Sequence, residues 1–131
     1  MKRIIGFACI LCVIILFSGT IQKDAEVELG DYYMEIDPTI PPPCVSITDE
    51  QIWFLYDYMS SNLTLGTYVV EGDVLTMTTD DGKERYVFKV KGDSLVFHAR
   101  KSSELKYVDE EHAFKVYDGA KFKLGEWISD N

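Results

Sequence analysis

The chain has 131 residues, and about 110 of them follow an N-terminal apolar segment, a length that suits one small domain. With 47% apolar and 13% aromatic residues, it is too hydrophobic for an intrinsically disordered protein. Its 22 acidic and 13 basic residues give a net charge of −9, and so acidic a chain repels phosphate backbones, which excludes nucleic-acid binding. One cysteine and two histidines follow the apolar segment, too few for a disulfide framework or a zinc site.

The N-terminal segment has the three parts of a secretory signal. Lys2 and Arg3 precede an apolar run over residues 4–17, and small residues occupy positions 18–20. Extended through Ile21, the run reaches the lower limit for a membrane-spanning helix. We therefore expect residues 1–21 to be a cleaved signal peptide or a retained anchor helix. In both cases the positive residues stay in the cytoplasm, and the rest of the chain is secreted or held outside the cell membrane.

Residues 22–43 are acidic and end in a proline-rich stretch. Consecutive prolines favour an extended polyproline II conformation, so we expect a tether of about 60 Å at full extension. Within it, Tyr32 to Ile36 are rich enough in β-favouring side chains to form a first or edge strand.

From Cys44 to about residue 125, apolar residues recur with the period of two that is typical of strands. Tight turns rich in glycine and aspartate separate the runs, and the Asp81-Gly82 pair gives the strongest hairpin signal. This pattern predicts an all-β domain over residues 44–125, an antiparallel meander of six to eight strands in a small closed or incomplete barrel, with residues 126–131 as a tail. The expected strands cover residues 44–48, 52–58, 66–70, 74–79, 86–90, 95–100, 114–117 and 120–124.

An ordered series of pieces of this pattern is similar to that of a known family. The pieces are Pro41–Asp49, Phe54 with Tyr56, Gly66–Tyr68, Leu75–Lys83, Tyr86–Phe88 and Gly92–Phe97. Together they resemble a small extracytoplasmic lipocalin-like β domain of Gram-positive bacteria. That domain occurs alone behind a signal segment, or at the C-terminus of membrane metallopeptidases related to β-lactam-sensor antirepressors. The resemblance covers about residues 38–124 and implies a barrel outside the cell membrane. It implies no catalytic residue, because the chain has no His-Glu-x-x-His helix.

Few other residues could carry chemistry. Cys44 has two interpretations, a thiol that pairs with another chain or a small buried residue that opens a strand. His98 is expected to face outward, and His112 belongs to a solvated loop. Asp80 and Asp81 are expected to serve the turn, because neighbouring turn residues do not converge as general acid–base catalysis requires. We therefore expect no enzyme activity, no bound metal and no cofactor.

The function expected from these features is that of a monomeric interaction or sensing module at the bacterial surface. Its partner would be a protein with a basic surface, and it would touch the membrane only through an uncleaved N-terminal segment. The candidate contact points are the outward faces and the acidic loop of Asp109, Glu110 and Glu111. The alternative is a lipocalin-like carrier of a small apolar ligand, although a barrel needs about eight strands to admit one.

Overall fold

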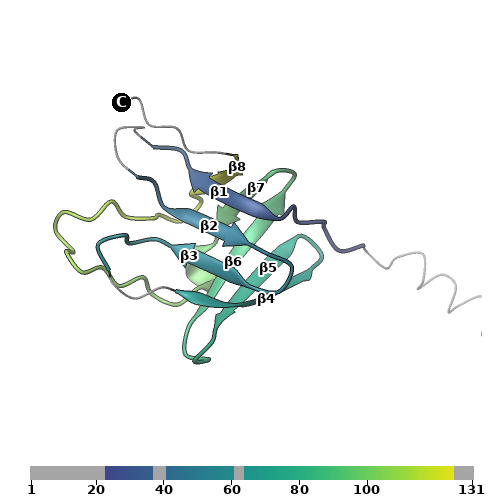
Figure 1. The fold of residues 1–131 in the computed structure, drawn as a ribbon, viewed down its shortest axis with the longest axis horizontal. Coiled ribbons are helices and arrows are strands. Elements are labelled where there is room, and N and C mark those ends of the chain that lie inside the picture. The colour runs from purple at the N-terminus through teal and green to yellow at the C-terminus, as the bar shows by residue number, and fades with distance from the viewer. Residues whose placement is uncertain (1–22, 37–40, 61–63, 126–131) are drawn as a thin grey trace, which may run out of the picture.

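The structure, a computed structural model that describes residues 23–36, 41–60 and 64–125, is a closed antiparallel barrel of eight strands. Each strand pairs with the next along the chain, and β8 also pairs with β1, which closes the barrel (Figure 1). The predicted all-β meander is thereby confirmed, and its up-and-down order is that of a small lipocalin-like barrel. The strands are β1 Gly30–Met34, β2 Cys44–Ile47, β3 Ile52–Leu55, β4 Leu65–Glu71, β5 Val74–Thr79, β6 Arg85–Lys91, β7 Ser94–Phe97 and β8 Lys121–Leu124.

The strands form where the sequence alternates, and they end where glycine permits a turn. In β5, Leu75 and Met77 are buried while the threonines between and beyond them lie nearer the surface. Gly72 and Gly92 have φ values of 64° and 59° and close the β4–β5 and β6–β7 hairpins, a conformation that other residues rarely adopt.

Aromatic rings fill the inside of the barrel. Phe54 lies at the centre of this cluster and is 1% exposed. Burying an aromatic side chain of this size contributes about 1.5–3 kcal/mol to the free energy of unfolding. Ring centroids lie 5.2–6.0 Å from that of Phe54 in Tyr56, Tyr86, Phe88, Phe97 and Phe122.

The prediction that residues 22–43 form a tether is wrong in part, because β1 lies within this range. Tyr32 and Met34 are buried, and β1 pairs with both β2 and β8. The physical reason is that these two side chains complete the barrel interior between the edges of β2 and β8. The barrel therefore begins at Gly30 rather than Cys44, and the expected strand near Tyr32 is confirmed.

The residues before β1 also lie against the barrel. The Ala25 amide donates to the carbonyl of Gly72 at 2.7 Å, and the Gly72 amide donates to Oδ1 of Asp24 at 2.7 Å. Ala25 and Val27 pack against the core. Residues 24–27 are thus attached to the barrel end that carries the β4–β5 hairpin, and they add no length to a spacer.

The expected signal or anchor over residues 1–21 and the C-terminal tail over residues 126–131 lie outside the described residues. Within the part of the chain that is described, no helix is both long and apolar enough to cross a membrane.

Three expected strands end early or are absent. The strand expected over residues 95–100 ends at Phe97 and is followed by a 3-10 helix at Ala99–Lys101. The strand expected over residues 52–58 ends at Leu55, because the chain turns at Asp57, whose Oδ1 accepts the amide of Met59. Residues 114–117 are not a strand but part of the long β7–β8 connection. In this connection the hydroxyls of Ser102 and Ser103 accept the amides of Val87 and Arg85, so they continue the pairing of β6 in place of a strand.

We predict that Gly66→Ala destabilises the barrel by about 3 kcal/mol, because a Cβ at this position would lie 2.0 Å from the backbone oxygen of Thr78. Urea unfolding followed by circular dichroism measures the change. The control is Gly119→Ala, where the added Cβ would meet no atom within 4 Å. Because the φ of Gly119 is 88°, which strains an alanine, this variant should lose about 1 kcal/mol of the free energy of unfolding. Equal losses in the two variants would contradict the close approach of β4 and β5.

Candidate functional site

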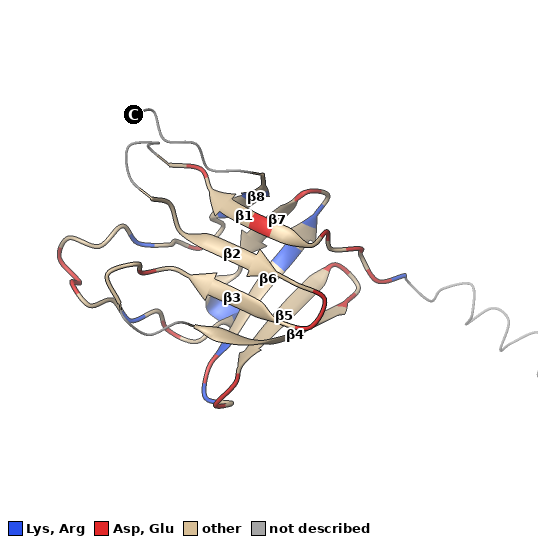
Figure 2. Ribbon diagram, in the orientation of Figure 1, with Lys and Arg blue, Asp and Glu red and all other residues tan. Residues whose placement is uncertain are grey.

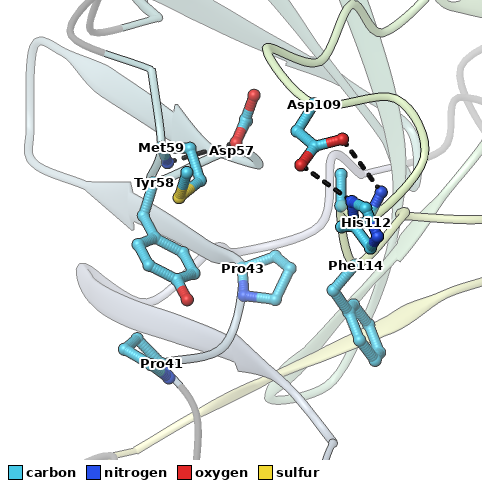
Figure 3. Close-up of a pocket in the computed structure, with 9 residues that line it drawn as sticks. Pro41, Pro43, Asp57, Tyr58, Met59, Asp109, His112 and Phe114 are labelled. Atoms are coloured by element: carbon cyan, nitrogen blue, oxygen red, sulfur yellow. Dashed lines mark hydrogen bonds and ion pairs between the residues drawn. The ribbon is translucent and has the colours of Figure 1, made fainter.

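A cleft opens at the end of the barrel opposite residues 24–27. Three connections form it: β1–β2, β3–β4 and β7–β8. In Figure 1 the β3–β4 and β7–β8 connections extend to the left, and the described residues before β1 lie at the right. The cleft has a volume of about 220 Å³. Its lining residues are Pro41, Pro43, Asp57, Tyr58, Met59, Asp109, His112, Ala113 and Phe114 (Figure 3).

Asp57 joins the two long connections that form the cleft. Its Oδ1 accepts the amide of Met59 at 3.1 Å, and its Oδ2 accepts the amide of Val108 at 2.8 Å. Next to it, the rings of Tyr56 and Tyr107 meet edge to face at 5.4 Å, and Tyr107 Oη accepts the amide of Val116 at 2.8 Å. The β7–β8 connection is therefore fixed to the barrel by hydrogen bonds and by ring packing.

Asp109 organises the other side of the cleft. Its Oδ1 accepts the amides of Glu111 and His112, and its Oδ2 lies 3.0 Å from Nδ1 of His112. Such a pair orients an imidazole, but nucleophilic catalysis also needs a nucleophile within its reach. The nine described lining residues include no serine, threonine, cysteine or lysine.

Large apolar side chains are exposed on the cleft walls. Tyr58 is 63% exposed, Met59 61% and Phe114 42%. Figure 3 shows the rings of Tyr58 and Phe114 on either side of Pro43, with Pro41 below Tyr58. Single exposed apolar residues are ordinary, but a cluster of them around one hollow is typical of a binding surface.

The charge around the cleft is negative. Asp57 and Asp109 line it, and no lysine or arginine is among the described lining residues. Glu110 and Glu111 follow Asp109 on the β7–β8 connection, which also carries the basic residues Arg100, Lys101, Lys106 and Lys115. Of these, Lys115 is 3.0 Å from Oε2 of Glu110. Figure 2 shows that acidic residues gather in the turns and loops rather than on the strands.

Of the three acidic residues proposed from the sequence, the structure brings Asp109 to the cleft. Glu110 pairs with Lys115, and Glu111 is exposed on the same loop. Sequence analysis missed Tyr58 and Phe114, which it assigned to strands. Asp57 is the signal that could have placed Tyr58 in a turn, since an aspartate often accepts the amide two residues later and starts a turn.

The remaining sequence candidates have structural roles. Cys44 is buried, and its burial, with a smaller contribution from Asp31, raises the pKa of its thiol to about 12. The amide of Lys83 and the hydroxyl of Thr79 donate to Asp81, which lowers the pKa of its carboxyl and holds the expected turn.

His98 differs from the outward position expected for it. It is partly buried, and its Nδ1 is enclosed with no hydrogen-bond partner among the described residues. The same residues contain no group of three or more histidine, cysteine, aspartate or glutamate side chains that could hold a metal ion.

A second hollow of about 410 Å³ lies beside the β5–β6 hairpin, between Tyr56 and Tyr86 on one side and Glu104 and Lys106 on the other. It is wider and its lining is more polar, so it offers less apolar surface to a partner than the cleft does. The cleft is therefore the stronger candidate site.

Comparisons with protein-family models, with curated proteins and with solved structures found no match for this chain. The resemblance to a Gram-positive extracytoplasmic domain thus stays a prediction.

We predict that Cys44 reacts with iodoacetamide about a hundredfold more slowly in the native protein than in concentrated urea at about pH 8. The thiolate is the nucleophile, and a raised pKa leaves almost none of it at that pH. The rate should rise about tenfold per pH unit until the pH nears the raised pKa. Peptide mapping separates Cys44 from Cys9 and Cys12. Equal rates in both states, or a disulfide from Cys44 to another chain, would contradict its burial.

We also predict that Asp57→Ala lowers the free energy of unfolding by about 1–2 kcal/mol, because the amides of Met59 and Val108 lose a charged acceptor. Hydrogen exchange at the Val108 amide should accelerate. The matched control is Asp80→Ala, which removes the same charge from an exposed turn position and should change neither quantity. Unchanged exchange at Val108 in the Asp57 variant would show that another contact holds the loop.

Proposed function

We propose that this protein is an exported, non-catalytic binding module that meets a protein partner at the outer face of the bacterial cell membrane. The observation that carries the proposal is the group of exposed apolar side chains, Tyr58, Met59 and Phe114, around a cleft at the end of a closed barrel. Exposed apolar surface of this kind is expensive in water and is ordinarily covered by a partner.

The position of the cleft supports a role at the membrane surface. The sequence predicts an export segment over residues 1–21, and the chain that follows lies against the opposite end of the barrel, at Gly72. A retained anchor would therefore point the cleft away from the lipid. The short chain between anchor and barrel would hold the module close to the bilayer.

The chemistry of the cleft supports binding rather than catalysis. Asp109 and His112 form an exposed pair, and Asp57 is engaged with two backbone amides. The other residues that line the cleft are proline, tyrosine, methionine, alanine and phenylalanine. These side chains offer apolar contact, which gives affinity without a reacting group.

The carrier alternative is less well supported. A lipocalin-like carrier holds its ligand inside the barrel, and here Phe54 and the rings around it occupy the centre. The cleft outside the barrel, at about 220 Å³, is smaller than the roughly 300–1,000 Å³ of a typical small-molecule site.

Site-specific photo-crosslinking in the source bacterium tests the proposal. A photoreactive amino acid replaces Tyr58 or Phe114 in the full chain, and the control replaces Val69, which is 57% exposed on β4. We expect one protein to be captured from both cleft positions and not from the control. Capture that is equal at Val69, or a small apolar ligand that co-purifies while no protein is captured, would overturn the proposal.

A further inference from the structure

Resting on the proposed function, the geometry points to an extended peptide segment of the partner as the occupant of the cleft, one in which apolar side chains alternate with lysine or arginine. The cleft supplies an apolar hollow and a negative rim at the same place. Each of the two features restricts the chemistry of the occupant.

The hollow restricts the occupant by size. Its volume of about 220 Å³ lies below that of ordinary small-molecule pockets, and it is open to solvent between Tyr58 and Phe114. One or two apolar side chains fill such a hollow while the chain that carries them continues outside it. A short peptide segment can bind in this way, with its apolar anchor side chain in the pocket and the rest of the segment along the rim.

The rim restricts the occupant by charge. Asp57 and Asp109 line the hollow, and no lysine or arginine is among the described residues that line it. Glu110 and Glu111 follow Asp109 on the β7–β8 connection, where Glu110 pairs with Lys115. Lysine or arginine side chains of the occupant, next to its apolar side chains in the hollow, would complement the negative charge of this rim. An anionic lipid surface or a polyphosphate would be repelled by it, and so would an acidic segment.

The two carboxylates of the cleft are fixed before any partner arrives. Asp57 holds the amides of Met59 and Val108, and Asp109 holds those of Glu111 and His112. Because these carboxylates are already held in place, binding costs less conformational entropy, and a short peptide segment can bind with measurable affinity.

Fluorescence anisotropy with three labelled synthetic decapeptides tests the inference on the full chain in a neutral detergent, with protein-free micelles as the blank. One peptide alternates lysine with leucine around a central proline. The second has glutamate for lysine, and the third has serine for leucine. We expect the first to bind at least about tenfold more tightly than either of the others, and less tightly as salt increases.

Variants locate the binding. Tyr58→Ser and Phe114→Ser should each weaken binding of the lysine–leucine peptide about fivefold or more, while Val69→Ser, a matched exposed position, should leave it unchanged. Asp109→Asn should reduce the salt dependence. Circular dichroism establishes that each variant is folded.

The outcomes separate this inference from the proposed function. If photo-crosslinking captures a partner but the glutamate peptide binds as well as the lysine peptide, the inference fails and the proposed function stands. Equal losses in the Val69 and Phe114 variants would place binding elsewhere and would also overturn the inference. If the lysine–leucine peptide binds the cleft but no protein is captured in cells, the peptide chemistry holds and the proposed function fails.

Discussion

The pairing of the first strand with the last is the interaction on which the rest of the structure depends. Tyr32 lies opposite Leu124 and Met34 opposite Phe122, so β1 joins β8 and no edge stays open along the described strands. The two ends of this barrel differ. The β2–β3, β4–β5 and β6–β7 turns and residues 24–27 occupy one end, and the connections that form the cleft occupy the other, together with the β5–β6 turn. A barrel without β1 would expose the edges of β2 and β8.

The packed interior reaches the cleft through a column of rings. Phe54 contacts Tyr56, and Tyr56 contacts Tyr107 on the β7–β8 connection. The hydrogen bond from the Val108 amide to Asp57 lies directly beside this column. The loops that form the cleft are therefore attached to the packed core by ring contacts and a hydrogen bond. This explains how loop residues can present a fixed surface without strands of their own.

The sequence predicted the barrel better than it predicted the cleft. β5 was predicted at its observed bounds, because alternation and flanking turns act over a few residues. β1 was partly hidden by its acidic surroundings, since composition alone does not distinguish a tether from a charged edge of a barrel. Tyr58 and Phe114 have the same apolar character as core residues, so periodicity assigned them to strands. The bond between Asp57 and Val108 spans 51 residues of sequence, and no local pattern encodes it.

Closure by the last strand has a consequence for folding during synthesis. A chain that is made from its N-terminus delivers β1 early, yet one of its two partners, β8, arrives only at the end. Such non-local pairing is slow, and until it forms the backbone of β1 is open to other chains. Asp31 lies on β1, and Glu28 and Glu35 flank it, all three exposed. Their like charges would hold two emerging copies apart, so the acidity that makes this segment look like a tether would protect the barrel while it is still incomplete.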